Sequence, residues 1–411
     1  MCDGIAAISG EMFVSEASKF AASPIREDDS IAAQLIKAGK KVIKLNTGDP
    51  AKYFSTPSYI INAYIKALKS NRTFYSDSQG IPELREAVSK RHKRLYGTDV
   101  DPSRIVITQG LSEALYFINT ALIDRGDSAV IIRPYYPSYL PYLNIVGGTA
   151  SFADYDEDKG WSIDTDALER VVKKARRLKY MLITNPNNPT GGVLEKGTLE
   201  EIVEIAKNHD LFLISDEIYD ELIFGGNFAS VSEVANGIPH MVLNGASKNL
   251  DATGFRIGYM LLPEEDEKST EFLKKIVDLA RMRLSANTPA QYAVAEGINN
   301  ENRHSKSVRE LRDEIKQRVL FVTREVNKSE YMQAVEPHGA FYVFPKIRLD
   351  ALRLKDDKEF VSRLLLEEYV QLTRGSGFGS PGHIRIVALP EKEVLGEAVA
   401  RIEEFCKRHA R

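Results

Sequence analysis

Short apolar runs alternate with helix-like patterns of apolar and polar positions between residues 104 and 262. The runs are rich in Val, Ile and Leu and read RIVIT, SAVIIR, TASFA, YMLIT, LFLIS, HMVLN and RIGYMLL. Between them, segments 111–123 and 198–208 place their apolar residues on one helical face. Strands and helices that alternate in this way form a mostly parallel sheet with helices on both faces. The pattern therefore predicts an α/β fold built on a seven-stranded sheet.

The pattern becomes helical after about residue 265, with a long charged stretch through 301–326. Candidate strands FYVFPKI and HIRIVAL and a terminal helix over 391–409 then predict a small α/β domain. A helix around 27–39 has no sheet of its own to cover, so we assign it to this small domain, which both termini would form. The predicted division is an N-terminal segment 1–45, a large domain 46–290 and a small domain 291–411.

Charge and cysteine content exclude several classes of protein. The 411 residues include 55 basic and 58 acidic side chains, a net charge of −3 with the signs interspersed, which argues against a nucleic-acid or anionic-membrane partner. Two cysteines exclude a disulfide scaffold and favour a reducing compartment. No signal-peptide pattern opens the chain, and no apolar run approaches the ~20 residues of a membrane span. We expect a cytoplasmic protein without a metal site.

Polar sequences follow four of the predicted strands directly: QGLSEAL, NPNNPTGG, DEIYDEL and GASKNLDATGFRIGY. Each has an ordinary explanation, because an acid after a strand often caps a helix, an Asn-Pro run is turn chemistry and a lone lysine is usually solvated. However, ligands of open parallel sheets bind beyond the carboxyl ends of the strands. The four sequences would meet at that edge, so together they predict a site.

The residue types at these strand ends suit a phosphorylated aldehyde cofactor. Lys248 can form a Schiff base with an aldehyde, and Asp216 can keep a pyridine nitrogen protonated. The backbone amides of Gly110, Leu111 and Ser112 open a helix and can hold a phosphate. Arg256, eight residues after Lys248, can add charge-assisted hydrogen bonds to the same phosphate.

From LNTGDP at 45–50 to HIRIVALP at 383–390, the chain resembles the fold-type I, pyridoxal-phosphate-dependent aminotransferases of the aspartate aminotransferase superfamily. It is most similar to the archaeal-type alanine aminotransferases in RTFYSDSQGIPELREAV, IRPYYPSY, NPNNPTG, ISDEIYDELIF, RLSANTPAQYA, PHGAFYVFPK and GSGFG. The resemblance implies pyridoxal 5′-phosphate as cofactor and a ping-pong exchange of an amino group between an amino acid and a 2-oxo acid. Alanine and 2-oxoglutarate are the substrates that it favours.

The resemblance also implies roles for single residues. Lys248 would be the Schiff-base residue and, once released, the base that shuttles the substrate proton. Asp216 would pair with the ring nitrogen of the cofactor. Tyr219 and Asn188 would donate hydrogen bonds to its ring oxygen O3′, and Tyr136 would stack on its ring.

Further residues would bind the substrate and the phosphate. Arg385 would clamp the α-carboxylate of the substrate, and Gly48 would let the substrate approach the backbone. Tyr75 would reach the phosphate in the neighbouring subunit of a homodimer. Many relatives carry a hydroxyl three residues before the lysine, where this chain has Gly245; Ser247 is the candidate to replace it.

Several alternatives stay open from the sequence. Arg281 and Arg283 lie where an arginine that reads a second carboxylate from the partner subunit could arise, but a solvated helix face explains them equally well. An aspartate or aromatic aminotransferase would use the same cofactor residues, and a carbon–sulfur lyase would use the same cofactor for elimination. A ligand-sensing module of a transcription regulator is disfavoured, because no basic recognition helix precedes LNTGDP.

Overall fold

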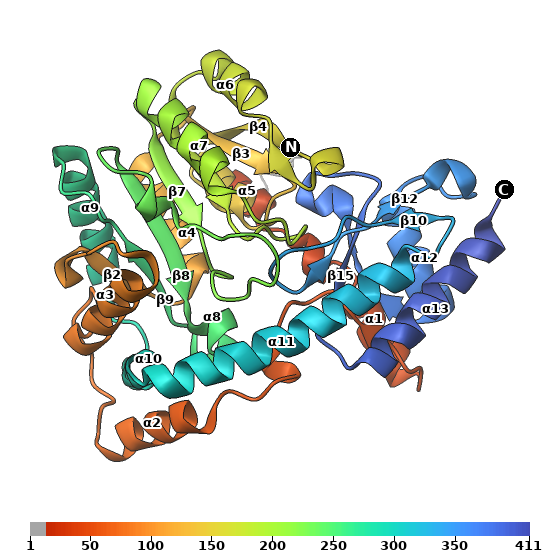
Figure 1. The fold of residues 1–411 in the computed structure, drawn as a ribbon, viewed down its shortest axis with the longest axis horizontal. Helices are drawn as coiled ribbons and strands as arrows, with labels where there is room; N and C mark the ends of the chain where they lie inside the picture. Colours follow the sequence, from red (N-terminus) through yellow and green to blue (C-terminus); the bar gives the residue numbers. More distant parts are fainter. Residues whose placement is uncertain (1–13) are drawn as a thin grey trace, which may run out of the picture.

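A computed structural model of the chain describes residues 14–411. A sheet-centred part and a smaller part lie side by side, and the long helix α11 (Glu301–Val326) runs from one to the other (Figure 1). No helix among the described residues is both long and apolar enough to cross a membrane. Two expectations concern residues 1–13: the absence of a signal peptide and the first part of the segment 1–45. These residues lie outside the described part of the chain.

The central sheet has eight strands. In spatial order they are β2 (Ile105–Thr108), β9 (Gly258–Leu261), β8 (His240–Gly245), β7 (Phe212–Asp216), β6 (Leu178–Thr184), β3 (Ser128–Arg133), β4 (Thr149–Asp156) and β5 (Ser162–Ile163). Six of the strands run in the same direction, and β9 and β5 run in the opposite one. All seven predicted strands are confirmed. The expected number is wrong by one, because the two residues of β5 are too few to show the alternation that identifies a strand.

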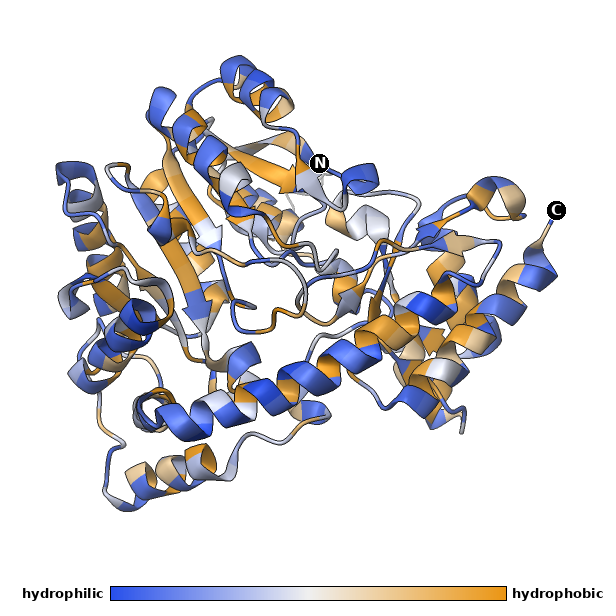
Figure 2. Cartoon of the chain, viewed as in Figure 1, coloured by the Kyte–Doolittle hydropathy of each residue, from blue (hydrophilic) through white to orange (hydrophobic). Residues whose placement is uncertain are grey.

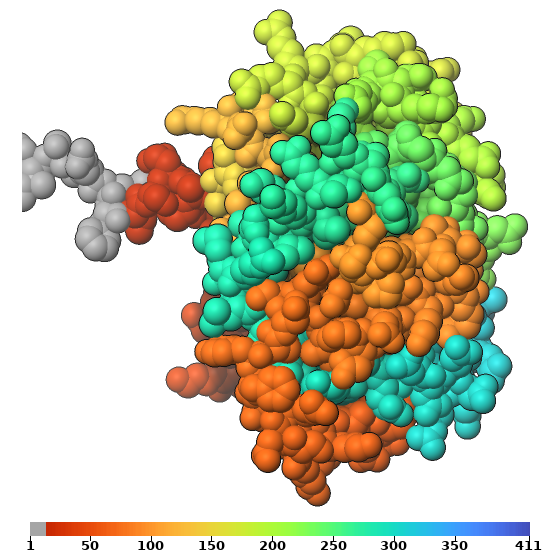
Figure 3. All heavy atoms as spheres, turned by 90° about the vertical axis from the view of Figure 1, so that its left-hand side faces the viewer, coloured from red at the N-terminus to blue at the C-terminus, as the bar shows by residue number. Residues whose placement is uncertain are grey.

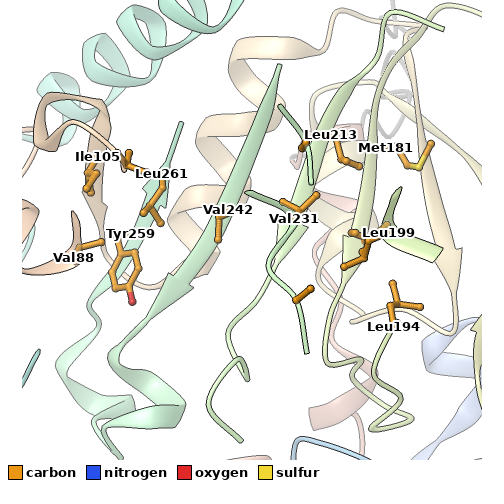
Figure 4. Close-up of a cluster of buried hydrophobic side chains, with 14 of the residues drawn as sticks. Val88, Ile105, Met181, Leu194, Leu199, Leu213, Val231, Val242, Tyr259 and Leu261 are labelled. Carbon is orange, nitrogen blue, oxygen red and sulfur yellow. The ribbon is translucent and has the colours of Figure 1, made fainter. Parts of the chain in front are cut away.

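Helices cover both faces of this sheet, as predicted. One face carries α3 (Pro82–Tyr96), α6 (Thr165–Lys174), α7 (Lys196–Asn208) and α10 (Thr288–Asn299); the other carries α4 (Leu111–Leu122), α5 (Tyr139–Ile145) and α9 (Glu267–Arg283). Successive strand residues enter different cores: Leu213 of β7 packs with the first set of helices, and Ile214 with the second. Figure 4 shows part of the first core, and Figure 2 shows the apolar strands enclosed between helices.

The amphipathic patterns explain where these helices form. Leu199, Ile202, Val203 and Ala206 of α7 are buried, which is the i, i+3, i+4, i+7 spacing of a single helix face. The predicted segments 111–123 and 198–208 agree with α4 and α7 to within two residues at each end.

The small unit has its own core, which joins residues from both ends of the chain. Ile43 and Leu45 pack there with side chains from the region 311–406. Its elements are α1 (Asp29–Lys37), β1 (Ile43–Lys44), β10 (Met332–Gln333), β11 (Tyr342–Val343), β12 (Lys346–Ile347), α12 (Asp357–Glu368), β13 (Val370–Gln371), β14 (Thr373–Arg374), β15 (Ile384–Val387) and α13 (Lys392–His409). β1 pairs in parallel with β13, so the N-terminal segment continues this unit. The exact domain boundaries at 45/46 and 290/291 stay a prediction.

The topology brings four strand ends to one edge. β2, β6, β7 and β8 are parallel, and they end at Thr108, Thr184, Asp216 and Gly245. The segments that follow these four residues therefore meet, and they do so next to the small unit.

Candidate active site

A cavity of about 540 Å³ lies between the carboxyl edge of the sheet and the small unit. Eleven of the thirteen predicted site residues line it: Gly48, Leu111, Ser112, Tyr136, Asn188, Asp216, Tyr219, Ser247, Lys248, Arg256 and Arg385. Gly110 lies directly before this lining, at the start of α4. Tyr75 does not reach the cavity of its own chain; 78% of its surface is exposed to solvent.

Lys248 lies on the short helix α8 (Ala246–Asn249) that follows β8. Its Nζ donates a hydrogen bond of 2.7 Å to the carbonyl oxygen of Gly48 and lies 5.5 Å from the ring centre of Phe341. The pKa of the amine is lowered from 10.5 to about 8, chiefly because the amine is removed from water; Asp49 opposes this shift, and Arg385 and Arg256 add to it. A substantial neutral fraction near pH 8 is what nucleophilic attack on an aldehyde requires.

Asp216 is the last residue of β7, and its side chain is buried. The carboxylate accepts hydrogen bonds from the Tyr139 hydroxyl at 2.6 Å and from the Ile218 backbone N–H at 3.2 Å. Burial raises its pKa to about 6 despite these donors. A cationic partner inside the cavity would stabilise the ionised carboxylate, so Asp216 fits the protonated nitrogen of a pyridine ring.

A hydrogen-bonded network links Tyr219 and Asn188. The Tyr219 and Tyr342 hydroxyls lie 2.8 Å apart, and the Asn188 amide donates to the Tyr219 oxygen at 3.5 Å. All three side chains line the cavity and are buried. The network thus presents hydroxyl and amide groups to one side of any occupant.

Arg385 of β15 is the most deeply buried cation of the cavity, with 1% of its surface exposed. It donates to Asn188 Oδ1 at 2.9 Å and to the carbonyl oxygen of Asn46, and its guanidinium lies 4.6 Å from the ring centre of Tyr342. Within the described part of the chain no carboxylate pairs with it, and its Nε has no hydrogen-bond partner. Because a buried unpaired charge is costly, this side chain is prepared for an anion.

A cradle for a second anion lies at the start of α4. Gly110 precedes the helix with a φ of +71°, a conformation that favours glycine. Arg256 covers it so closely that a Cβ at residue 110 would collide with the guanidinium. The Arg256 guanidinium donates to the carbonyl of Thr253 at 2.9 Å. Backbone amides at a helix N-terminus together with this guanidinium fit a phosphate.

The structure explains the absence of a hydroxyl side chain at residue 245. A Cβ on Gly245 would lie 2.7 Å from the carbonyl oxygen of Ile257 and 2.9 Å from Cα of Gly258. Both are backbone atoms of or next to β9, which cannot move aside without disturbing the β8–β9 pairing. Ser247 lines the cavity and is the hydroxyl available on this side.

Neither candidate for reading a second carboxylate from the partner subunit lies in the cavity of its own chain. Arg283 pairs with Glu113 at 2.9 Å and donates to the carbonyls of Ser78 and Ile107, so it braces α9 against β2. Arg281 is exposed and pairs with Asp278 on its own helix. The contacts of Arg283 are those of a structural residue, and those of Arg281 are typical of a solvated helix face.

Sequence reasoning missed several residues of the site. Tyr342 lies in PHGAFYVFPK, a motif that carried the resemblance, but its hydroxyl was not recognised as a partner of Tyr219. The Tyr139 hydroxyl, at the start of α5, donates to Asp216 and lies within hydrogen-bond distance of the Thr184 hydroxyl. Ser23 and Arg26 reach the cavity from the N-terminal segment. Only the folded chain brings these segments together.

The chain is similar over nearly its whole length to proteins of known families. A family model described as aminotransferase class I and II matches residues 40–402. An aspartate aminotransferase of Thermotoga maritima is 35% identical over 94% of this chain and 97% of its own length. An alanine aminotransferase of Mycobacterium tuberculosis is 34% identical over 91% of this chain and 87% of its own length.

Solved structures extend this similarity to the fold. An alanine aminotransferase structure from Pyrococcus furiosus superposes with a TM-score of 0.92 at 38% identity, covering 96% of this chain and all of that one. The named relatives thus include proteins of two different amino-acid specificities.

Proposed function

Because the chain belongs to the class I and II aminotransferases and is therefore a pyridoxal-phosphate-dependent transaminase, we propose that it exchanges an amino group between L-alanine and 2-oxoglutarate. Bound pyridoxal phosphate supplies an electrophilic carbonyl and an electron-withdrawing ring that make the Cα proton of an amino acid acidic. The observation that carries the proposal is the buried, unpaired guanidinium of Arg385 in the same cavity as Lys248.

One group of cavity residues would bind the cofactor. The amides at 110–112, Ser247 and Arg256 would hold the phosphate, and Asp216 would keep the ring nitrogen protonated. Tyr219 and Asn188 would donate to the ring oxygen. Tyr136 would cover the ring face.

Two residues would act on the substrate itself. Arg385 would bind the α-carboxylate with two parallel N–H···O bonds, a geometry that lysine cannot reproduce. Nζ of Lys248, neutral above about pH 8, would remove the proton from Cα and deliver it back on the same side of the site. Gly48 would let the substrate approach the backbone; its missing Cβ also lets the Tyr342 hydroxyl pack against it, since a Cβ there would collide with that hydroxyl.

The choice of alanine rests on relatives. The Pyrococcus furiosus structure, an alanine aminotransferase, is 38% identical to this chain, whereas the aspartate aminotransferases in the structural comparison are 30–34% identical. We infer from this difference that L-alanine is preferred over L-aspartate.

Initial rates with L-alanine, L-aspartate and L-phenylalanine, each with 2-oxoglutarate as acceptor, test the substrate. We expect the highest kcat/KM for L-alanine. A higher kcat/KM for L-aspartate or L-phenylalanine would show that this amino acid, and not L-alanine, is the preferred substrate. Release of ammonia and an oxo acid from L-cystathionine, with no 2-oxo acid present, would instead show a carbon–sulfur lyase.

We further propose that two copies form a homodimer in which Tyr75 reaches the phosphate site of the neighbouring subunit. The helix α2 (Ser58–Lys69) exposes Ile61, Ile65 and Leu68 along one face, and Phe74 and Tyr75 follow it. Met282 and Leu284, at the end of α9, are exposed as well. Figure 3 views this side of the molecule, where the orange segment containing α2 and α3 adjoins the teal segment containing α9. Large exposed apolar side chains over neighbouring elements are typical of an interface.

A further inference from the structure

We propose that Arg26 binds the side-chain carboxylate of a dicarboxylate substrate and thereby lets the site accept glutamate and 2-oxoglutarate. The proposal rests on the proposed function, since it concerns the second substrate pair of the same cavity. Arg26 lies in the short 3-10 turn η2 (Pro24–Arg26) of the N-terminal segment and lines the cavity.

The exchange of alanine requires no contact with Arg26, because the other cations of the cavity account for the cofactor and for one carboxylate. The cationic lining residues are Arg26, Lys248, Arg256 and Arg385, and the anionic ones are Asp49 and Asp216. Lys248 acts on the cofactor and on Cα, Arg256 faces the phosphate cradle, and Arg385 takes one carboxylate. Alanine and pyruvate each carry a single carboxylate, whereas glutamate and 2-oxoglutarate carry two. The fourth cation therefore matches the charge of the larger substrates.

The two acidic residues of the lining already have partners. Asp49 accepts a hydrogen bond from Thr253 at 2.7 Å and faces Lys52 at 3.9 Å. Asp216 is held by Tyr139. Among residues 14–411 no acidic side chain forms an ion pair with Arg26. Its guanidinium is thus available to a carboxylate that enters the cavity.

Contacts of the residues on both sides of Arg26 hold its backbone beside the cavity. The carbonyl of Ile25 accepts a hydrogen bond of 2.8 Å from the Asn46 amide. Glu27 pairs with Arg374 at 2.7 Å and Lys358 at 3.3 Å. Pro24 packs so closely on Gly377 that a Cβ there would lie 2.5 Å from the Pro24 Cβ. The backbone that carries Arg26 is therefore held against the small unit, which also carries Arg385.

Asn46 connects the two proposed carboxylate sites. Its side chain holds the carbonyl of Ile25, the residue before Arg26, and its own carbonyl oxygen accepts a hydrogen bond from Arg385. The backbone next to Arg26 and the guanidinium of Arg385 are thus positioned by one residue. Such a coupled pair is suited to a ligand with a carboxylate at each end.

Exposure explains how one site can accept both kinds of substrate. Arg385 is buried, so every substrate has to supply a carboxylate to it. Arg26 is exposed, so its charge stays solvated when alanine or pyruvate leaves it unpaired. The same cavity can therefore alternate between monocarboxylate and dicarboxylate substrates without a buried charge that lacks a partner.

The variant Arg26→Gln tests the proposal by the ratio of kcat/KM for L-glutamate to that for L-alanine. We expect the ratio to fall about tenfold or more, because a charge-assisted contact to only one of the two substrates is lost. Arg26→Lys should restore part of it, since lysine keeps the charge but not the planar fork. Arg309→Gln is the matched control, because Arg309 is an exposed arginine of α11 outside the cavity; it should leave the ratio at the wild-type value.

Binding of substrate analogues gives a readout that does not depend on turnover. Calorimetric titration of the holoenzyme with glutarate and with butyrate compares a dicarboxylate with a monocarboxylate. Arg26→Gln should raise the Kd of glutarate about tenfold relative to that of butyrate. Equal losses for both analogues, or an unchanged glutarate affinity, would overturn the role of Arg26.

The two proposals can fail separately. A wild-type enzyme that uses L-glutamate but not L-alanine would refute alanine specificity, and the glutarate comparison would still decide the role of Arg26. A wild-type enzyme that exchanges L-alanine with 2-oxoglutarate, but whose Arg26→Gln variant keeps the wild-type substrate ratio and glutarate affinity, would refute the inference on Arg26 alone.

Discussion

The charged residues of the cavity differ chiefly in how far they are removed from water. Arg385 is buried and Lys248 is partly buried, and this removal from water lowers the pKa of both side chains. Arg26 and Arg256 are exposed. Arg385 and Lys248 can therefore provide strong, specific contacts to the reacting end of a substrate, whereas the exposed pair can remain solvated between ligands.

The pKa of Lys248 makes loading of the apoenzyme pH-dependent. An amine with a pKa of about 8 is charged below that pH and neutral above it, and only the neutral form attacks an aldehyde. We expect the rate of covalent attachment of pyridoxal phosphate to rise through pH 8 and to level off above it.

Stopped-flow measurement of the visible absorption at a series of pH values checks this expectation. The variant Lys248→Ala should bind the cofactor without acquiring the wild-type absorption. A rate that keeps rising towards pH 10.5, the ordinary value for lysine, would show that burial does not depress the pKa of Lys248.

At the scale of elements, the site depends on where strands end and how closely they approach. The close packing of β8 and β9 at Gly245 places α8, and with it Lys248, at the edge of the sheet. The variant Gly245→Ala should lower the free energy of unfolding by about 1–3 kcal/mol, because its Cβ meets backbone atoms.

Thermal unfolding of this variant, followed by circular dichroism, measures the effect. Gly197→Ala is the control, because Gly197 lies in α7 and a Cβ there has nothing within 4 Å. It should leave the melting temperature unchanged or raise it slightly. An unchanged stability for Gly245→Ala would mean that the backbone of β9 can shift at little cost in free energy. Close packing would then not explain why a hydroxyl side chain is absent at residue 245.

The elements that sequence patterns predicted are those whose signal is local. The seven strands and helices α4, α7, α11 and α13 each carry a period of apolar residues within their own length. The two-residue strand β5 has no such period. Lys248, Asp216 and Asn188 could be found because each follows a strand in a distinctive motif. Tyr342 and Arg26 could not, because their place in the site depends on packing between segments distant in the sequence.

At the scale of the whole molecule, the cavity lies between two units, and one predicted contributor is missing from it. Tyr75 does not line its own cavity and is exposed to solvent, as is the neighbouring Phe74. If Tyr75 serves the neighbouring subunit, Tyr75→Phe should weaken retention of pyridoxal phosphate in the homodimer. Mixed dimers with Lys248→Ala should recover retention, because the intact Lys248 of one subunit then meets the intact Tyr75 of the other.

Retention of the cofactor during dialysis, compared between the Tyr75→Phe dimer and the mixed dimer, measures this effect. Equal retention in both would place the action of Tyr75 within its own subunit. Sedimentation of the wild-type protein as a monomer that retains full activity would refute the shared site altogether.

The measurement that tests the central claim most directly is the visible absorption spectrum of the purified holoenzyme before and after addition of L-alanine alone. With no 2-oxo acid present, a transaminase can complete only the first half of its reaction. We expect L-alanine to convert the cofactor to its aminated form, with one pyruvate released per active site, and subsequent 2-oxoglutarate to restore the original spectrum. A spectrum that neither L-alanine nor any other amino acid changes would contradict the assignment of this cavity as the site of amino transfer.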